Sequence, residues 1–208
     1  QKQGSYVGGL FVFESKLTQE FRLHLDEKIA EMFQSIGIRE GSVWIEVFHD
    51  GENYYFNEVG FRYGGSVSIY PVDYFYQINQ VAADIHYALT GESCISEHTS
   101  LIRSTLPRKK YYCIYPVHIN AGTISSISGL DKIAQLENIV YLATTKYLHD
   151  RIESSGSFSQ VFALVHFVCN TTEECIQTID RIHQMLVVFD EHGNNMVNRM
   201  LDVGKIIF

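Results

Sequence analysis

The stretch that decides the fold runs from residue 41 to residue 65 and reads Gly41-Ser-Val-Trp-Ile-Glu46-Val-Phe-His-Asp-Gly51-Glu-Asn-Tyr-Tyr-Phe-Asn-Glu58-Val-Gly60-Phe-Arg62-Tyr-Gly64-Gly65. Two runs rich in β-branched and aromatic residues, 42–48 and 54–61, flank Asp50-Gly51. Such residues favour strands, and Asp-Gly favours a tight turn between them. The stretch therefore predicts a β-hairpin that carries two glutamates and an arginine.

The register of this hairpin decides whether Glu46 and Glu58 meet, because successive side chains of a strand point to opposite faces. A two-residue loop at Asp50-Gly51 would separate the two glutamates. A three-residue loop that starts at His49, with Gly51 in the left-handed conformation, puts both on one face with Arg62. That face then also carries Trp44, Phe48, Tyr54 and Phe56, and the other face carries Val43, Ile45, Val47, Val59 and Phe61. The second set is wholly apolar, which favours the three-residue loop.

Two carboxylates side by side on a sheet face repel each other, and a divalent cation between them relieves the repulsion. Oxygen ligands suit Mg²⁺ that is held jointly with the phosphates of a nucleotide. Arg62, further along the same face, can bind a phosphate or a carboxylate through its planar fork of N–H donors. On geometry alone, an ordinary surface hairpin explains the three residues equally well.

The order of these residues resembles the metal-binding strands of ATP-grasp enzymes, in the subgroup that includes biotin carboxylase and carbamoyl-phosphate synthetase. There, one strand carries a metal-binding glutamate and the next carries a glutamate-x-asparagine-x-arginine pattern. The resemblance implies that Glu46 and Glu58 bind Mg²⁺ against the phosphates of ATP. It also implies that Arg62 holds an acyl phosphate or the carboxylate substrate.

The same resemblance implies nucleotide contacts at Phe48, Trp44 and the Gly64-Gly65 pair. Phe48 falls where the family places an apolar side chain against adenine, and Trp44 would be a further wall. Packing in a core explains both aromatic residues equally well.

The chain departs from the family pattern at Gly60, which stands where the pattern has asparagine. Gly60 has no side-chain oxygen to offer a metal. Asn57 points to the opposite face in the predicted register, so it is a poor replacement. The site then either binds metal with one ligand fewer, with water filling in, or is degenerate.

The rest of the chain predicts an α+β fold with mainly antiparallel sheet and flanking helices, as in the C-terminal region of ATP-grasp enzymes. We expect residues 1–105 to form the subdomain with the metal strands and residues 106–208 to form a C-terminal α+β lobe. Residues 122–129 resemble the C-terminal lobe of amino-acid-ligase-type members. The patterns predict helices over 18–36, with Thr18 as the N-cap, over 78–89, over 130–136 and from Thr171 to about Met185. They predict strands over 111–119, 139–145, 161–168 and 186–189, and a loop that enters a short strand over 64–71.

Composition excludes several other classes of function. The net charge of −8 argues against broad nucleic-acid binding, and no P-loop or G-x-S-x-G motif is present. No apolar run reaches the length of a membrane span and no signal peptide is seen, so we expect a cytoplasmic protein. The four cysteines show no metal-ligand spacing, and most sit in apolar runs, so we expect reduced, packed thiols. His86 and His166 lie within a helix pattern and a strand pattern and are expected to be packed, hydrogen-bonded histidines.

From the resemblance, we expect the chain to be a fragment of an ATP- and Mg²⁺-dependent carboxylate–amine ligase that acts through an acyl phosphate. A carbamoyl-phosphate-synthetase-like enzyme using bicarbonate is a close variant. Neither Lys2 nor Lys16, ahead of the hairpin, sits in a suitable strand context, so we expect the lysines of an ATP-grasp lid to be missing and ATP binding by the fragment alone to be weak or absent. The expected partners are ATP, a small carboxylate, an amine and the rest of a parent chain, with a homodimer left open. The alternatives are a non-catalytic ATP-grasp-like binding or assembly module, and an unrelated α+β binding domain.

Overall fold

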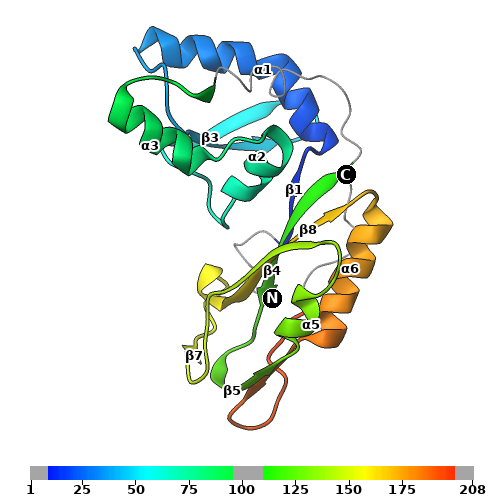
Figure 1. Ribbon diagram of the computed structural model, residues 1–208. Helices are drawn as coiled ribbons and strands as arrows, with labels where there is room; N and C mark the ends of the chain where they lie inside the picture. Colours follow the sequence, from blue (N-terminus) through cyan, green and yellow to red (C-terminus); the bar gives the residue numbers. More distant parts are fainter. Residues whose placement is uncertain (1–8, 96–109, 200–208) are drawn as a thin grey trace. The chain divides into compact units, whose positions relative to one another are not determined.

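The computed structural model describes residues 9–95 and 110–199, which form two compact units (Figure 1). We call residues 9–18 together with 110–199 the sheet unit, and residues 19–95 the hairpin unit. The ladders of both units are antiparallel and helices flank the sheets, so the fold is α+β as predicted. Within the described ranges, no helix has the length and apolar character needed to cross a membrane.

The hairpin unit consists of a long helix, a β-hairpin and two shorter helices. These are α1 (Lys16–Ser35), whose first residues belong to the sheet unit, β2 (Trp44–His49), β3 (Tyr54–Gly60), α2 (Ile69–Tyr76) and α3 (Gln80–Thr90). The predicted cap at Thr18 is wrong. The hydroxyl of Ser15 accepts a hydrogen bond from the backbone N–H of Thr18 at 3.3 Å, so the helix begins earlier in the chain.

The segment after the hairpin corrects one prediction and confirms another. Residues 64–71 do not lead into a strand, because Ile69 begins helix α2 with Pro71 buried in its first turn. Proline is tolerated there, since the first turn of a helix has no hydrogen-bond partner for the missing N–H. The next predicted helix is α3, in which the side chain of Asn79 caps the N-terminus and Gly91 ends the helix at φ 73°.

The sheet unit contains two sheets. The first has the strand order β1-β4-β8-β6, and the second has the order β7-β5-β9. The strands are β1 (Phe11–Phe13), β4 (Tyr111–His118), β5 (Gly122–Ser128), β6 (Ile139–Thr144), β7 (Arg151–Ile152), β8 (Val161–Cys169) and β9 (Val187–Asp190), and the helices are α5 (Leu130–Ala134), the short 3-10 turn Phe158–Gln160 and α6 (Thr172–Met185).

The core of the sheet unit lies between the first sheet and helix α6. Strand β8 is buried at every position but one, as its almost entirely apolar sequence predicts. Helix α6 buries Cys175, Thr178, Ile179 and Ile182. The predicted start of this helix at Thr171 is confirmed: the side chain of Thr171 accepts a hydrogen bond from the N–H of Glu174, whose carboxylate accepts one from the N–H of Asn170.

The N-terminal strand belongs to the sheet unit. Phe11 pairs with Ile114 and Phe13 pairs with Tyr112, so β1 is an edge strand beside β4. The division at residues 105 and 106 expected from the sequence placed this strand with the hairpin. That expected boundary itself lies outside the described residues. Pairing between segments so far apart in the chain leaves no local sequence signal.

Candidate metal-binding site

Glu46 and Glu58 are direct partners across the β2–β3 hairpin. Residues directly opposite each other in an antiparallel pair point to the same face, with their Cβ atoms about 5 Å apart. The two carboxylates therefore share one face, as the sequence predicted. Glu46 is half-buried and Glu58 is exposed, so a ligand from solvent can reach both.

The two glutamates share a face, but the loop that connects their strands is longer than the sequence predicted. The last pair of the ladder is His49 with Tyr54, so the loop has four residues, Asp50 to Asn53, and the predicted three-residue loop is wrong. One side-chain oxygen of Asp50 accepts hydrogen bonds from the N–H groups of Asn53 at 2.8 Å and Glu52 at 2.9 Å. The second oxygen accepts from the Tyr55 hydroxyl at 2.9 Å. These bonds lower the pKa of Asp50, which stays ionised and holds the longer loop together.

A β-bulge at Asn57 restores the pairing of the glutamates. Glu46 pairs with Glu58 but the next residue, Val47, pairs with Phe56, so Asn57 is the extra residue. Its side-chain Nδ2 donates a hydrogen bond to Oε1 of Glu46 at 2.6 Å. The prediction that Asn57 points away from the glutamates is therefore wrong. The bulge brings an amide group next to the carboxylate pair.

The same bulge moves two aromatic residues to the other face. Phe48 pairs with Tyr55 on the face of the glutamates, whereas Tyr54 and Phe56 lie opposite, contrary to the prediction. Tyr54 and Phe56 contact Phe21 of α1, with ring centroids 5.5 and 6.4 Å apart. Helix α1 therefore packs against the face without the glutamates. Phe48 stays 59% exposed on the glutamate face.

Arg62 and Trp44 form one end of the glutamate face. The Arg62 guanidinium carbon lies 4.9 Å from the centre of the Trp44 ring, and Nη1 donates to the carbonyl of Tyr63 at 3.0 Å. A Cβ added at Gly60 would lie 3.5 Å from Cγ and Nε of Arg62. A methyl group fits at that distance, so position 60 lies in ordinary contact with the arginine that covers Trp44.

The two glycines after Arg62 have unequal surroundings. A Cβ at Gly64 would collide with the hydroxyl of Ser68 and lie 3.1 Å from Cδ1 of Trp44, whereas a Cβ at Gly65 meets nothing within 4 Å. Ser66 and Val67, which follow, have φ values of 57° and 58°. Left-handed backbone is costly for a β-branched residue, so this loop holds strain beside the candidate site.

Tyr63 ties this loop to helix α3. Its hydroxyl donates a hydrogen bond to Oδ2 of Asp84 at 2.8 Å. The bond to that carboxylate raises the pKa of Tyr63, so the tyrosine remains a donor at neutral pH. The position of Arg62 is therefore supported from both sides, by the end of β3 and by the Tyr63 contact.

Two groups of residues elsewhere bear on the predictions. His166 is buried and hydrogen-bonded to the Tyr112 hydroxyl at 3.0 Å, as predicted, but His86 is exposed on α3 and is not a packed histidine. The four cysteines are free thiols, and the three buried ones come together in the sheet unit. Neither this cluster nor the contact of Asn57 with Glu46 was predicted from the sequence, because a bulge and a long-range contact leave no characteristic residue spacing.

The chain is similar to known proteins in structure, whereas its sequence matches none of those compared. No family model and no curated protein matches the sequence. Solved structures do match. An L-amino acid ligase from Bacillus licheniformis aligns with a TM-score of 0.71 and 21% identity over 89% of this chain and 45% of its own. A phosphoribosylglycinamide synthetase from Anaerococcus prevotii aligns with a TM-score of 0.70 and 13% identity over 90% of this chain and 48% of its own.

A third match is the biotin carboxylase domain of a 2-oxoglutarate carboxylase from Hydrogenobacter thermophilus, in a complex with MgADP and bicarbonate. It aligns with a TM-score of 0.64 and 14% identity over 89% of this chain and 40% of its own. All three are ATP-grasp ligases. The chain has an ATP-grasp ligase fold. The chain spans less than half the length of each of these structures.

Proposed function

We propose that this chain is the part of an ATP-grasp carboxylate–amine ligase that binds Mg²⁺ and the phosphates of ATP. The observation that carries the proposal is the direct pairing of Glu46 with Glu58 on an accessible sheet face, in a chain with the ATP-grasp fold. An ordinary surface hairpin has no reason to place two carboxylates opposite each other, because like charges there are destabilising.

The donors around the glutamates fit a magnesium ion. Mg²⁺ prefers oxygen ligands and is usually held by one or two carboxylates, with substrate phosphates and waters in the other positions. Glu46 and Glu58 supply the carboxylates, and Asn57 orients Glu46 through its hydrogen bond. Asn57 thus offers from the bulge the amide group that Gly60 lacks. When bound, Mg²⁺ neutralises charge on the phosphoryl group during its transfer.

The neighbouring residues supply binding and orientation. Stacking on Trp44 holds the guanidinium of Arg62 in one plane, so its N–H edges are available to an acyl phosphate or a carboxylate substrate. Phe48 offers an exposed apolar ring on the same face, which suits a contact with adenine. The close approach of Gly64 to Trp44 keeps the indole in place.

A carboxylate–amine reaction is preferred over a bicarbonate-using one because the amino acid ligase has a higher TM-score and identity than the carboxylase domains. The chain covers only part of its relatives, so the proposal includes further protein that completes the nucleotide cleft. Free cysteines suit a reducing, cytoplasmic setting for the whole enzyme.

The single tryptophan makes the site directly observable, since Trp44 is the only indole in the chain. We would titrate the chain with Mn²⁺, in the presence and absence of ATP, and follow the broadening of the Trp44 indole N–H resonance by NMR. Paramagnetic broadening detects binding even when it is weak. We expect saturable broadening in the unaltered chain and at least tenfold weaker binding in Glu58→Gln.

Glu52→Gln is the matched control, because Glu52 lies in the loop of the same hairpin and its substitution removes the same negative charge. It should bind Mn²⁺ like the unaltered chain. Equal binding by the Glu58→Gln and Glu52→Gln variants would refute the metal site.

A non-catalytic ATP-grasp-like module is the second candidate, and the glycine at position 60 favours it. The two candidates differ in turnover by the longest natural form of the protein. A ligase releases phosphate from ATP only when a carboxylate and an amine are both supplied, and a binding module releases none.

A further inference from the structure

Three cysteines from separate parts of the chain meet inside the sheet unit. Cys113 lies on β4, Cys169 ends β8, and Cys175 lies in the first turns of α6. Their Sγ atoms all lie within 4.8 Å of one another, and those of Cys113 and Cys169 are 3.7 Å apart. All three are free thiols and are at most 2% exposed.

The spacing of the sulfur atoms suits a shared metal ion. Three thiolates about 2.3 Å from one ion lie about 3.8–4.0 Å from each other, whether the arrangement is tetrahedral or trigonal. The three side chains here need only a small closure to reach that geometry. A disulfide is less well supported, because Cys113 pairs with Phe167 and Cys169 pairs with Tyr111, so the two cysteines lie diagonally across the ladder.

The cluster lies near the start of helix α6. Helix α6 begins at Thr172, so its positive N-terminal end lies next to Cys175. Metal binding by thiols releases their protons, because the thiolate is the ligand.

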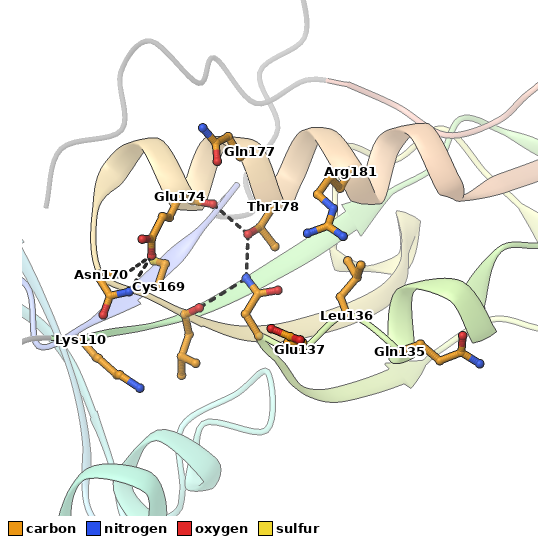
Figure 2. Close-up of a pocket in the computed structure, with 12 residues that line it drawn as sticks. Lys110, Gln135, Leu136, Glu137, Cys169, Asn170, Glu174, Gln177, Thr178 and Arg181 are labelled. Carbon is orange, nitrogen blue, oxygen red and sulfur yellow. Dashed lines mark hydrogen bonds between the residues drawn. The ribbon is translucent and has the colours of Figure 1, made fainter.

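The cluster lies beside a surface hollow at Cys169. This residue lines a hollow of about 590 Å³ between the end of β8 and helix α6, together with Lys110, Asn170, Glu174, Thr178 and Arg181. Figure 2 shows Cys169 next to Asn170 under the first turn of α6, with Glu174 and Thr178 above it. The side chain of Asn170 donates to Glu174, and Thr178 donates to the backbone carbonyl of Glu174. Of the three cysteines, only Cys169 lines this hollow.

We propose that Cys113, Cys169 and Cys175 bind one soft monovalent cation of the Cu(I) type through three sulfur atoms. Thiolates select soft ions over Mg²⁺ or Ca²⁺. In residues 9–95 and 110–199, no further His, Cys, Asp or Glu ligand atom joins the cluster, whereas structural Zn²⁺ sites have four protein ligands. The site lies in the sheet unit and does not depend on the proposed ligase function.

The test is an anaerobic titration of the reduced, metal-free chain with Cu(I), in competition with a coloured Cu(I) chelator. We expect one tightly bound equivalent, with X-ray absorption showing three sulfur neighbours. Cys175→Ser should weaken binding at least tenfold. Cys94→Ser is the matched control, because Cys94 is exposed and outside the cluster, and it should bind like the unaltered chain.

Two results would overturn the assignment. Unchanged Cu(I) binding by a folded Cys175→Ser variant, with circular dichroism confirming the fold, would show that the cluster is not the site. Tighter binding of Zn²⁺ with four ligands would show that the ion is divalent and tetrahedral. Should Cys175→Ser fail to fold, Cys169→Ala removes the thiol at the surface hollow and answers the same question.

Discussion

The two units of this chain differ in how completely they bury their own side chains. In the sheet unit, strands β4 and β8 are almost wholly buried and share one core with helix α6. In the hairpin unit, the 20-residue helix α1 has no buried residue, and five consecutive residues of β3 are exposed. The sheet unit is therefore stabilised by its own core. The hairpin unit leaves an accessible face, where the candidate site lies.

The largest expected effect compares one phenylalanine from each unit. Phe162→Ala removes a fully buried ring from the core of the sheet unit and should lower the free energy of unfolding by about 3–5 kcal/mol. Phe61→Ala removes a ring that is 60% exposed and should cost less than about 1 kcal/mol. Urea unfolding followed by circular dichroism measures both, and equal costs would contradict the comparison.

The second effect concerns a place where the hairpin unit is tightly packed. Gly64→Ala should destabilise the hairpin unit by about 1–3 kcal/mol, because the new methyl group collides with Ser68 and presses on Trp44. Gly65→Ala is the matched control with open space around its Cβ. Trp44 fluorescence during urea unfolding reports on this site. A loss of stability in Gly65→Ala as large as in Gly64→Ala would mean that backbone freedom, and not packing against Trp44, explains the pair.

The third effect isolates ligand orientation from stability. Asn57→Ala removes the hydrogen bond to Glu46 and should weaken Mn²⁺ binding about tenfold, as loss of an orienting partner does at metal sites. Stability should change little, since Asn57 is exposed. Asn53→Ala, in the loop of the same hairpin, should leave metal affinity near that of the unaltered chain. Metal affinity that is insensitive to Asn57→Ala would remove the asparagine from the proposed site.

The smallest expected effect is a dependence of the stability of the sheet unit on pH. Burial and the nearby charge of Arg199 lower the pKa of His183 below its ordinary value of 6.5. The hydroxyl oxygen of Tyr115 lies 2.6 Å from Nε2 of His183, within hydrogen-bond distance. The unfolded chain binds this proton more readily, so the stability contributed by neutral His183 is fully present above pH 6.5. It is lost as the pH falls through the lowered pKa.

The variant His183→Gln tests that assignment, because it keeps a polar partner for Tyr115 without a group that titrates. Urea midpoints measured across this pH range should slope less in the variant than in the unaltered chain. Identical slopes would place the pH dependence on another group.

The fate of individual predictions shows where sequence reasoning succeeds. The strand predicted over 161–168 and the helix predicted from Thr171 were confirmed as β8 and α6, because each depends on a local pattern of apolar residues or of capping residues. The strand expected before Pro71 was wrong, since the first turn of a helix and an extended loop accept proline equally well. The shared face of Glu46 and Glu58 was predicted correctly from an incorrect loop, because a longer loop and a bulge compensated for each other.

The sequence by itself determined that residues 41–65 form a hairpin with two glutamates and an arginine, because alternation and turn chemistry act between near neighbours. Only the tertiary structure decided the register of that hairpin, the placing of Asn57 beside Glu46, and the stacking of Arg62 on Trp44. It also decided the pairing of β1 with β4 and the meeting of the three cysteines. These contacts join segments that come together only when the whole unit packs. The local pattern of apolar and polar residues therefore does not predict them.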